Sequence, residues 1–347
     1  MNKTMRYTLL LATILFSGFV LPQYVYAGVA GQKPFFTSKP GTAIPVSQDY
    51  IYSITAEDSS GSNVSVLTIT LPAWLSFDHS SNSIQGKSNK AGQYFVDIIA
   101  FNKTDTTHQR FILTVTNNKT ASILCLGNSI TNGTNKYNSY RRALWQMLHK
   151  ANYNFDLIGS WDKHHMGGDV PDADFDMDHD GHSGWRFDDI FNPPSWDSAR
   201  GNINSWLQSY KPDIVLLELG TNDVFQCRTV KDMIYDLQKL VAAFRKRNNK
   251  VKILLAQIPP LGKEWATKKL CGDSTDYDHA IRNLNHAFAD FAKNNTKKES
   301  TIKIVDQYSG INTDTEMYDD IHPNEAGEKV MAQKWYSALR KYLYKLQ

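Results

Sequence analysis

The sequence has almost no excess of charge of either sign. Its 38 basic and 35 acidic side chains leave a net charge of +3 over 347 residues. Proteins that are drawn to nucleic acid or to anionic membranes carry a clear positive excess, so the near balance favours neither partner. Internal repeats and low-complexity tracts are also missing from the sequence. The length leaves room for two ordinary globular domains.

The one long apolar run lies at the N-terminus and predicts a signal peptide. A positively charged start precedes an apolar core over residues 7–21, and Val25 and Ala27 offer small side chains where a signal peptidase cleaves. The alternative is an uncleaved anchor helix, but the run is shorter than the roughly 20 apolar residues that a membrane span needs. We therefore expect residues 1–27 to be removed and the mature chain to be secreted or periplasmic, without a membrane span.

Three cysteines leave at least one thiol unpaired. Cys125 lies in the apolar run Ile123-Leu124-Cys125-Leu126, which predicts a buried strand, so we interpret Cys125 as a packed free thiol. Cys227 and Cys271 both lie in loops after predicted strands, and an exported chain can oxidise them. We predict a Cys227–Cys271 disulfide; the alternative is three free thiols.

Residues 33–117 predict a small all-β sandwich, because short runs of alternating apolar residues are separated by turn residues and no helical period occurs. The clearest runs are residues 50–54, 64–69, 94–100 and 111–115. The stretch Leu71-Pro72-Ala73-Trp74-Leu75-Ser76-Phe77-Asp78 resembles the bacterial immunoglobulin-like or cadherin-like domain, which implies that Trp74 packs into the core. No catalytic set of side chains can be assembled here. We interpret the domain as a spacer, a stabilising neighbour or a weak binder of carbohydrate or of the cell surface.

Residues 121–347 alternate apolar strands with amphipathic helices, which predicts a parallel sheet covered on both faces. Five such units suit an α/β domain with a flavodoxin-like, doubly wound, five-stranded parallel sheet, whose sites lie at the carboxyl ends of the strands. The predicted strands are residues 122–126, 155–159, 214–219, 251–258 and 302–305, and the predicted helices are residues 140–150, 196–210, 229–248, 277–294 and 324–346.

Four short polar blocks fall at or near these strand ends and together supply the parts for acyl transfer through a covalent ester. They are Gly127-Asn128-Ser129-Ile130-Thr131, Gly181-His182-Ser183-Gly184-Trp185, Gly220-Thr221-Asn222-Asp223 and Asp319-Asp320-Ile321-His322-Pro323. In the first block, Ser129 follows a strand directly, so we expect it to be the nucleophile; the alternative is a helix-capping serine. Thr131 stands where the motif G-x-S-x-G has its second glycine, which argues against an α/β-hydrolase.

The remaining blocks supply a base and an oxyanion hole. His322 is the predicted general base, and Asp319 is favoured over Asp320 as its orienting carboxylate because a spacing of three residues lets it reach Nδ1. The side-chain amide of Asn222 and the backbone N–H groups of Ser129 and Gly184 are the predicted oxyanion donors. The alternative for Asn222 is a turn residue.

Residues 121–347 resemble the SGNH, or GDSL-type, hydrolase superfamily, whose four letters match Ser129, Gly184, Asn222 and His322. Within this superfamily, three stretches of the sequence are similar to carbohydrate esterase family 3, the acetyl xylan esterases. They are the stretch around Tyr140-Arg141-Arg142, the block that ends in Trp185-Arg186, and His322-Pro323-Asn324-Glu325-Ala326-Gly327. The resemblance implies serine-dependent removal of acetyl groups from sugar hydroxyls, without a catalytic metal. Asn128 departs from the family's usual Asp before the serine; that residue braces the serine loop, so we expect the mechanism to survive.

A run of aspartates precedes the second block. Asp176, Asp178 and Asp180 copy the start of a calcium loop, but Phe187 replaces the glutamate of its twelfth position, which excludes an EF-hand. No cofactor is required for the predicted chemistry. A structural calcium ion stays an open alternative to an acidic, solvated rim.

We therefore expect a secreted serine esterase whose partner is an acylated, above all acetylated, polysaccharide or oligosaccharide. Trp185 and Tyr140 are the predicted sugar-binding residues, with Trp161 and Trp196 as further candidates, although core packing is the commoner fate of each. One alternative is a lipolytic esterase, a lysophospholipase or thioesterase, that uses the same residues on a long apolar groove. The other is a carbohydrate-binding protein that Asn128 has made catalytically dead.

Overall fold

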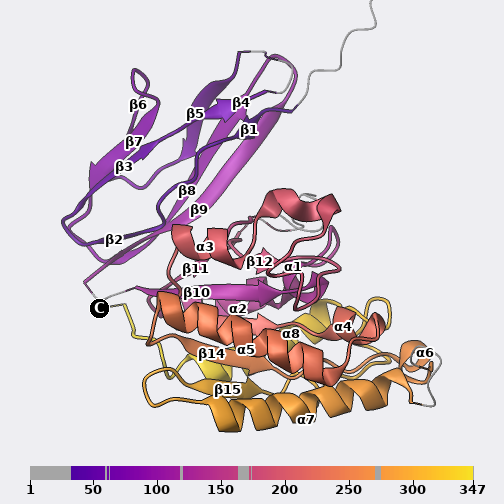
Figure 1. Ribbon diagram of the computed structural model, residues 1–347. Helices are drawn as coiled ribbons and strands as arrows, with labels where there is room; N and C mark the ends of the chain where they lie inside the picture. The colour runs from indigo at the N-terminus through magenta and orange to yellow at the C-terminus, as the bar shows by residue number, and fades with distance from the viewer. Residues whose placement is uncertain are drawn as a thin grey trace, which may run out of the picture.

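The computed structural model describes residues 33–58, 61, 63–117, 120–162, 172, 174–269 and 275–346, which form an N-terminal β domain and a larger α/β domain (Figure 1). The predicted signal peptide, residues 1–27, lies outside the described residues. Across the described ranges, every helix is too short or too polar to cross a membrane.

The N-terminal domain is the predicted β sandwich. Alternate residues of its strands point into a shared apolar core that includes Tyr52, Ile84 and Leu113, and the partly buried Trp74 packs against it as expected. Its four-stranded sheet has the order β2 (Ala43–Pro45), β9 (Thr106–Thr116), β8 (Gly92–Phe101), β5 (Ser65–Thr70). The three-stranded sheet has the order β3 (Asp49–Ser53), β7 (Ser83–Lys87), β6 (Leu75–Asp78), and β1 (Phe35–Phe36) pairs with β4 (Ala56–Glu57).

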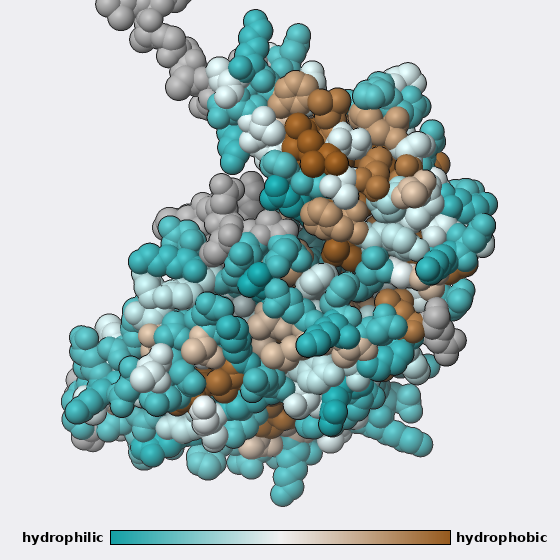
Figure 2. Space-filling model, turned by 180° about the vertical axis from the view of Figure 1, so that it is seen from behind, coloured by the Kyte–Doolittle hydropathy of each residue, from teal (hydrophilic) through white to brown (hydrophobic). Residues whose placement is uncertain are grey.

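Apolar side chains also gather on the outside of this domain, whereas the visible face of the α/β domain is mostly hydrophilic (Figure 2). The exposed large apolar side chains of the N-terminal domain are Phe35, Ile51, Leu67, Ile69 and Phe95.

The α/β domain has the predicted five-stranded parallel sheet, in the order β11 (Phe155–Ile158), β10 (Ala121–Gly127), β13 (Ile214–Glu218), β14 (Lys252–Ala256), β15 (Ile302–Val305). A short parallel strand that the sequence analysis missed, β12 (Asp180–Gly181), pairs with Leu126 and Gly127. It can do so because β11 pairs with β10 only as far as Leu124, which leaves the last residues of β10 unpaired on that side. The chain of the second polar block thereby enters the sheet beside the end of β10.

Helices cover both faces of the sheet because successive strand residues point to opposite sides. Leu216 packs with α2 (Ser139–Lys150) and α8 (Glu325–Leu339), and its neighbour Leu217 packs with α3 (Ile203–Ser209), α5 (Val230–Arg247) and α7 (Tyr277–Asn295). Three one-turn helices follow strands at the carboxyl edge, namely α1 (Ser129–Asn132), α4 (Thr221–Phe225) and α6 (Lys263–Ala266).

Two predicted helices are shorter than expected. Residues 196–210 form a 3₁₀ segment, η2 (Ser195–Arg200), and then α3, because Gly201 adopts a φ of +74° and Asn202 starts a new helix with its own capping box. The last helix ends at Leu339, before the predicted residue 346.

The two domains are joined by direct contacts. Ile112 of β9 packs against the core beneath α2 and α8. Asn154 donates a hydrogen bond to Thr116 Oγ1 at 2.8 Å, and Thr42 donates to Asp156 of β11 at 2.5 Å. The N-terminal domain is therefore anchored along the β11 edge of the α/β domain.

Candidate active site

Ser129 lies at the carboxyl end of β10, where the strand turns directly into α1. The turn is tight: a Cβ at Gly127 would lie 2.3 Å from the carbonyl oxygen of Glu218, so only glycine fits there. Asn128 is fully buried, and its Oδ1 accepts a hydrogen bond from the Ile130 N–H at 2.9 Å. Asn128 therefore caps α1 and braces the serine loop, which is the role that we expected for this position.

His322 faces Ser129 from the loop that precedes α8. Its Nε2 lies 2.7 Å from Ser129 Oγ, and its Nδ1 lies 2.9 Å from both carboxylate oxygens of Asp319. The Ser129 hydroxyl, the imidazole and the carboxylate thus form one continuous hydrogen-bonded line. The structure places Asp319 at Nδ1, whereas Asp320 accepts a hydrogen bond from the Gly262 N–H through its backbone carbonyl, at 2.7 Å.

Asp319 is itself held in place by backbone donors. Its Oδ1 accepts hydrogen bonds from the N–H groups of Ile321 and His322, at 3.2 and 2.8 Å. Burial acts to raise the pKa of Asp319, but the hydrogen bonds from His322 outweigh it and hold that pKa below the usual value. Asp319 is therefore ionised at neutral pH, as a carboxylate that stabilises an imidazolium must be.

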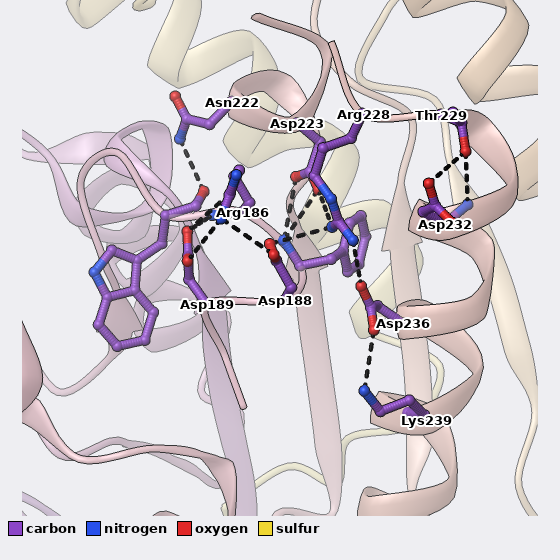
Figure 3. Close-up of polar contacts among 12 residues, drawn as sticks. Arg186, Asp188, Asp189, Asn222, Asp223, Arg228, Thr229, Asp232, Asp236 and Lys239 are labelled. Atoms are coloured by element: carbon purple, nitrogen blue, oxygen red, sulfur yellow. Dashed lines mark hydrogen bonds and ion pairs between the residues drawn. The ribbon is translucent and has the colours of Figure 1, made fainter. Parts of the chain in front are cut away.

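The predicted oxyanion donors lie at the ends of β10, β12 and β13. The Ser129 N–H and the Gly184 N–H donate no hydrogen bond to an acceptor in the described part of the chain. Gly184 has a φ of +82°, which a residue with a Cβ rarely adopts. Asn222, in α4, donates one amide hydrogen to the Trp185 carbonyl at 2.9 Å, and this bond orients the side chain (Figure 3). The second amide hydrogen can then serve an oxyanion.

A buried ion-pair network behind Asn222 was not foreseen. Thr229 caps α5, whereas the buried Asp223 accepts hydrogen bonds from the Phe187 N–H. Arg228 lies between Asp223, at 2.8 Å, and Asp236, at 2.7 Å (Figure 3). Burial raises the pKa of Asp223 to about 6, against the attraction of Arg228. The network ties the loop after Gly184 to α4 and α5.

A second buried carboxyl group lies beneath the serine loop. Glu218, the last residue of β13, is fully buried, and its Oε2 accepts a hydrogen bond from Thr131 Oγ1 at 3.4 Å. Burial raises the pKa of Glu218 to about 8. Glu218 is therefore a neutral carboxylic acid at pH 7. Its apolar neighbours in the strand gave no indication of this in the sequence.

The predicted sugar-binding residues Trp185 and Tyr140 are both fully buried, so the prediction is wrong for their side chains. Trp185 donates from Nε1 to Asp197 at 3.0 Å and stacks on His182, whereas Tyr140 lies 3.1 Å from Thr131 Oγ1. Trp196 of η2 is 68% exposed instead. A Cβ on Gly184 would lie 3.6 Å from its indole ring, so this exposed ring borders the predicted oxyanion hole.

The three candidate calcium ligands have separate protein partners. Asp176 accepts a hydrogen bond from the Leu157 N–H at 3.0 Å, Asp178 pairs with Lys39 at 3.0 Å, and Asp180 accepts from the Ser160 N–H at 3.0 Å. Among the residues that the structure describes, no group of three or more His, Cys, Asp or Glu side chains is arranged to hold a metal ion. These three carboxyl groups therefore serve as hydrogen-bond acceptors or ion-pair partners of the protein's own groups.

The states of the two cysteines that the structure describes agree with the prediction. Cys125 is a fully buried free thiol in β10. Cys227 is disulfide-bonded, and Cys271, its predicted partner, lies outside the described residues. The pairing of the two stays a prediction.

Comparison with known proteins gives matches to both domains. The family model of the GDSL-like lipase/acylhydrolase family matches residues 125–330, and that of the family described as "Putative Ig domain" matches residues 33–116. A multidomain esterase from Ruminococcus flavefaciens is 28% identical over 234 residues, which are 65% of this chain but only 29% of that protein.

Many solved structures resemble the chain, among them two esterases. A carbohydrate esterase of family 3 from Talaromyces cellulolyticus is 30% identical, with a TM-score of 0.51 over 64% of this chain and 97% of its own. A variant of an acetyl esterase with an acetate ion matches with the same identity, TM-score and shares of both chains.

Proposed function

The chain belongs to the GDSL-like lipase/acylhydrolase family, and we propose that it is an exported serine esterase that removes short acyl groups, above all acetyl, from carbohydrate. The observation that carries the proposal is the line of contacts from Ser129 Oγ through the His322 imidazole to Asp319, with distances of 2.7 and 2.9 Å. A serine at the carboxyl end of a buried strand that faces such a pair is activated for attack on an ester.

The geometry supports a two-step mechanism that needs no cofactor. His322 Nε2 takes the proton of Ser129 Oγ as this oxygen attacks the ester carbonyl carbon. Hydrogen bonds from Ser129 N–H, Gly184 N–H and the Asn222 amide stabilise the resulting oxyanion. His322 then gives its proton to the departing sugar oxygen, and the acyl group stays on Ser129.

Water completes the second step. His322 takes a proton from the water as its oxygen attacks the acyl carbon, and the tetrahedral intermediate again places its negative oxygen on the three donors. Collapse of the intermediate returns the proton to Ser129 and releases the carboxylic acid. Asp319 stays ionised throughout and stabilises the imidazolium that forms in both steps.

Trp196 supports a carbohydrate as the alcohol part of the substrate. Its indole ring is exposed and borders Gly184, while Asp197, the next residue, holds the segment through Trp185 Nε1 at 3.0 Å and Arg200 at 2.9 Å. An exposed indole beside the predicted oxyanion hole offers a flat apolar face for a sugar ring. The names of the similar solved structures, a family 3 carbohydrate esterase and an acetyl esterase, point the same way.

The two alternatives are less well supported. A lipolytic esterase needs a long apolar groove, whereas the pocket beside Ser129 is small and includes the polar groups of Thr134, Tyr137 and Glu328. A dead enzyme would need Asn128 to disable the site. Asn128 instead caps α1 by accepting the Ile130 N–H, a bond that an amide oxygen makes as well as a carboxylate does.

The test is release of p-nitrophenol from acetate, butyrate and octanoate esters by the wild type and Ser129→Ala, followed by release of acetic acid from acetylated xylan. We expect activity that is greatest on acetate and is abolished in Ser129→Ala. A preference for octanoate would favour the lipolytic alternative. Turnover that persists in Ser129→Ala would contradict the proposal.

A further inference from the structure

Lys39 of the N-terminal domain reaches into the α/β domain and holds both stems of the loop between β11 and β12. It lies between β1 and β2. Its ammonium group donates to the Gly159 carbonyl at 2.9 Å, just after β11, and pairs with Asp178 at 3.0 Å, just before β12. One cation from one domain therefore bridges two segments of the other that are 19 residues apart in sequence.

The same two stems are paired with each other next to this contact. The N–H of Trp161 donates to the His179 carbonyl at 3.1 Å, and the N–H of His179 donates to the Trp161 carbonyl at 2.8 Å. Gly159 packs so closely on His179 that a Cβ there would lie 2.3 Å from its backbone. The Lys39 contact thus lies beside two closely paired stems.

Several carboxyl groups gather around the segment that Lys39 holds. Asp178 lies near Asp176 and Asp156, and Asp162 on the outgoing stem also acts on it, while Arg141 is the cation that faces it from α2. Burial raises the pKa of Asp156 to about 7 and that of Asp178 to about 6, and Lys39 opposes both shifts. Lys39 therefore supplies positive charge where the α/β domain brings several carboxyl groups together.

This segment leads directly to the oxyanion donor. Asp178 is two residues before β12, and β12 pairs with Leu126 and Gly127, just before Ser129. The His182 N–H then donates to the Gly127 carbonyl at 2.9 Å, and Gly184 follows two residues later. A shift of the stem at Asp178 is thereby passed along a short, hydrogen-bonded chain to the Gly184 N–H.

We propose that Lys39 is a positioning residue for the esterase reaction: by bridging Gly159 and Asp178, the N-terminal domain holds the strand that aims the Gly184 N–H at the oxyanion. The immunoglobulin-like domain is then a working part of the catalytic unit and more than a spacer. The effect on catalysis rests on the proposed function, whereas the effect on the stability of the loop does not.

The test compares Lys39→Met, Lys39→Arg and the double variant Lys39→Met with Asp178→Asn, all in the full chain. Displacement of an oxyanion donor acts in the transition state, so we expect Lys39→Met to lower kcat on p-nitrophenyl acetate about five- to tenfold with KM unchanged. Its unfolding midpoint should fall by about 2 °C, because the Lys39 side chain is half-exposed and such pairs contribute modestly. Lys39→Arg keeps the bridge and should restore both quantities. The double variant removes the stranded charge but has no bridge, so it should regain the unfolding midpoint while kcat stays as low as in Lys39→Met.

Lys87→Met is the matched control, since Lys87 also lies in the N-terminal domain and pairs with an exposed carboxylate, Asp49, at 3.2 Å. It should leave kcat and the midpoint unchanged. Wild-type kcat in Lys39→Met, a change in KM alone, or a double variant with wild-type kcat would each overturn the proposal. If Lys39→Met is recovered unfolded, Lys39→Gln replaces it. Ser129→Ala, run in parallel, shows separately whether the measured turnover belongs to the proposed site.

Discussion

Replacement of Asn222 by alanine tests the oxyanion hole most directly. The Asn222 amide is the only one of the three proposed donors that belongs to a side chain, so it alone can be deleted without changing the backbone. Alanine suits the helical conformation of position 222 in α4, and Gly220 and Thr221 before it are unaffected.

The magnitude follows from the two hydrogen bonds that the amide can make. Loss of an oxyanion donor costs about 2.7–4 kcal/mol of transition-state stabilisation, which is a factor of about 10²–10³ in kcat. Asn222 is half-buried, so water can partly replace it, and we expect the lower end, about 100-fold. Loss of the bond to the Trp185 carbonyl, 2.9 Å in the wild type, should cost only about 1 kcal/mol of folding stability.

The assay is steady-state hydrolysis of p-nitrophenyl acetate together with thermal unfolding. Asn222→Ala should lower kcat with little change in KM, because the donor acts on charge that exists only in the transition state. Asn202→Ala is the control: it removes the cap of α3 and costs about 1 kcal/mol of stability, but should leave kcat unchanged. A kcat within tenfold of the wild type for Asn222→Ala, or a loss confined to KM, would refute the assignment of this amide.

Three further outcomes are expected. Trp196→Ala should raise KM for acetylated xylo-oligosaccharides about tenfold and leave hydrolysis of p-nitrophenyl acetate unchanged, since only the sugar would use the indole; equal effects on both substrates would argue against a sugar platform. Arg228→Met leaves the carboxylates of Asp223 and Asp236 without their shared cation, and should cost about 3 kcal/mol in denaturant unfolding. Removal of the exposed Lys329–Glu325 pair by Lys329→Met should cost far less, and equal losses would contradict the network. Glu218 has a folded-state pKa of about 8, above the ordinary value of about 4.3 that it has in the unfolded chain. Between these two values the folded protein holds a proton that the unfolded protein has lost, so the free energy of unfolding falls as the pH rises toward 8. Glu218→Gln should therefore show a smaller fall in unfolding midpoint between pH 6 and 9 than the wild type, and parallel curves would contradict this.

The secondary structure of the α/β domain was largely readable from the sequence, because strands and helices bury their faces with different periods. The five long strands are where the apolar runs predicted them. The misses have local causes: Gly201 divides the predicted helix over residues 196–210, and β12 has only two residues, Asp180 and Gly181, without an apolar pattern. So short a strand forms only because the end of β10 offers it unpaired backbone groups.

The roles of individual aromatic residues were not readable. Trp185 and Trp196 are eleven residues apart in one loop region, and nothing in their neighbours distinguishes a buried indole from an exposed one. The structure buries Trp185 because Asp197 accepts its N–H and His182 stacks on its ring, and it leaves Trp196 outside. The same limit hid the contact of Asp223 with the Phe187 N–H and that of Glu218 with Thr131, because both partners are distant in the sequence.

The sequence by itself determined the two-domain plan, the parallel sheet and the residue types at its carboxyl edge, because periodicity and motif order are local properties of the chain. It also indicated Asp319 as the partner of His322, because three residues of a turn suffice to bring them together. Tertiary structure alone decided which indole faces solvent, which cation meets each buried carboxylate, and that Lys39 of one domain holds the loop of the other. Such contacts join residues distant in the chain, and they depend on how whole elements pack, which no local pattern encodes.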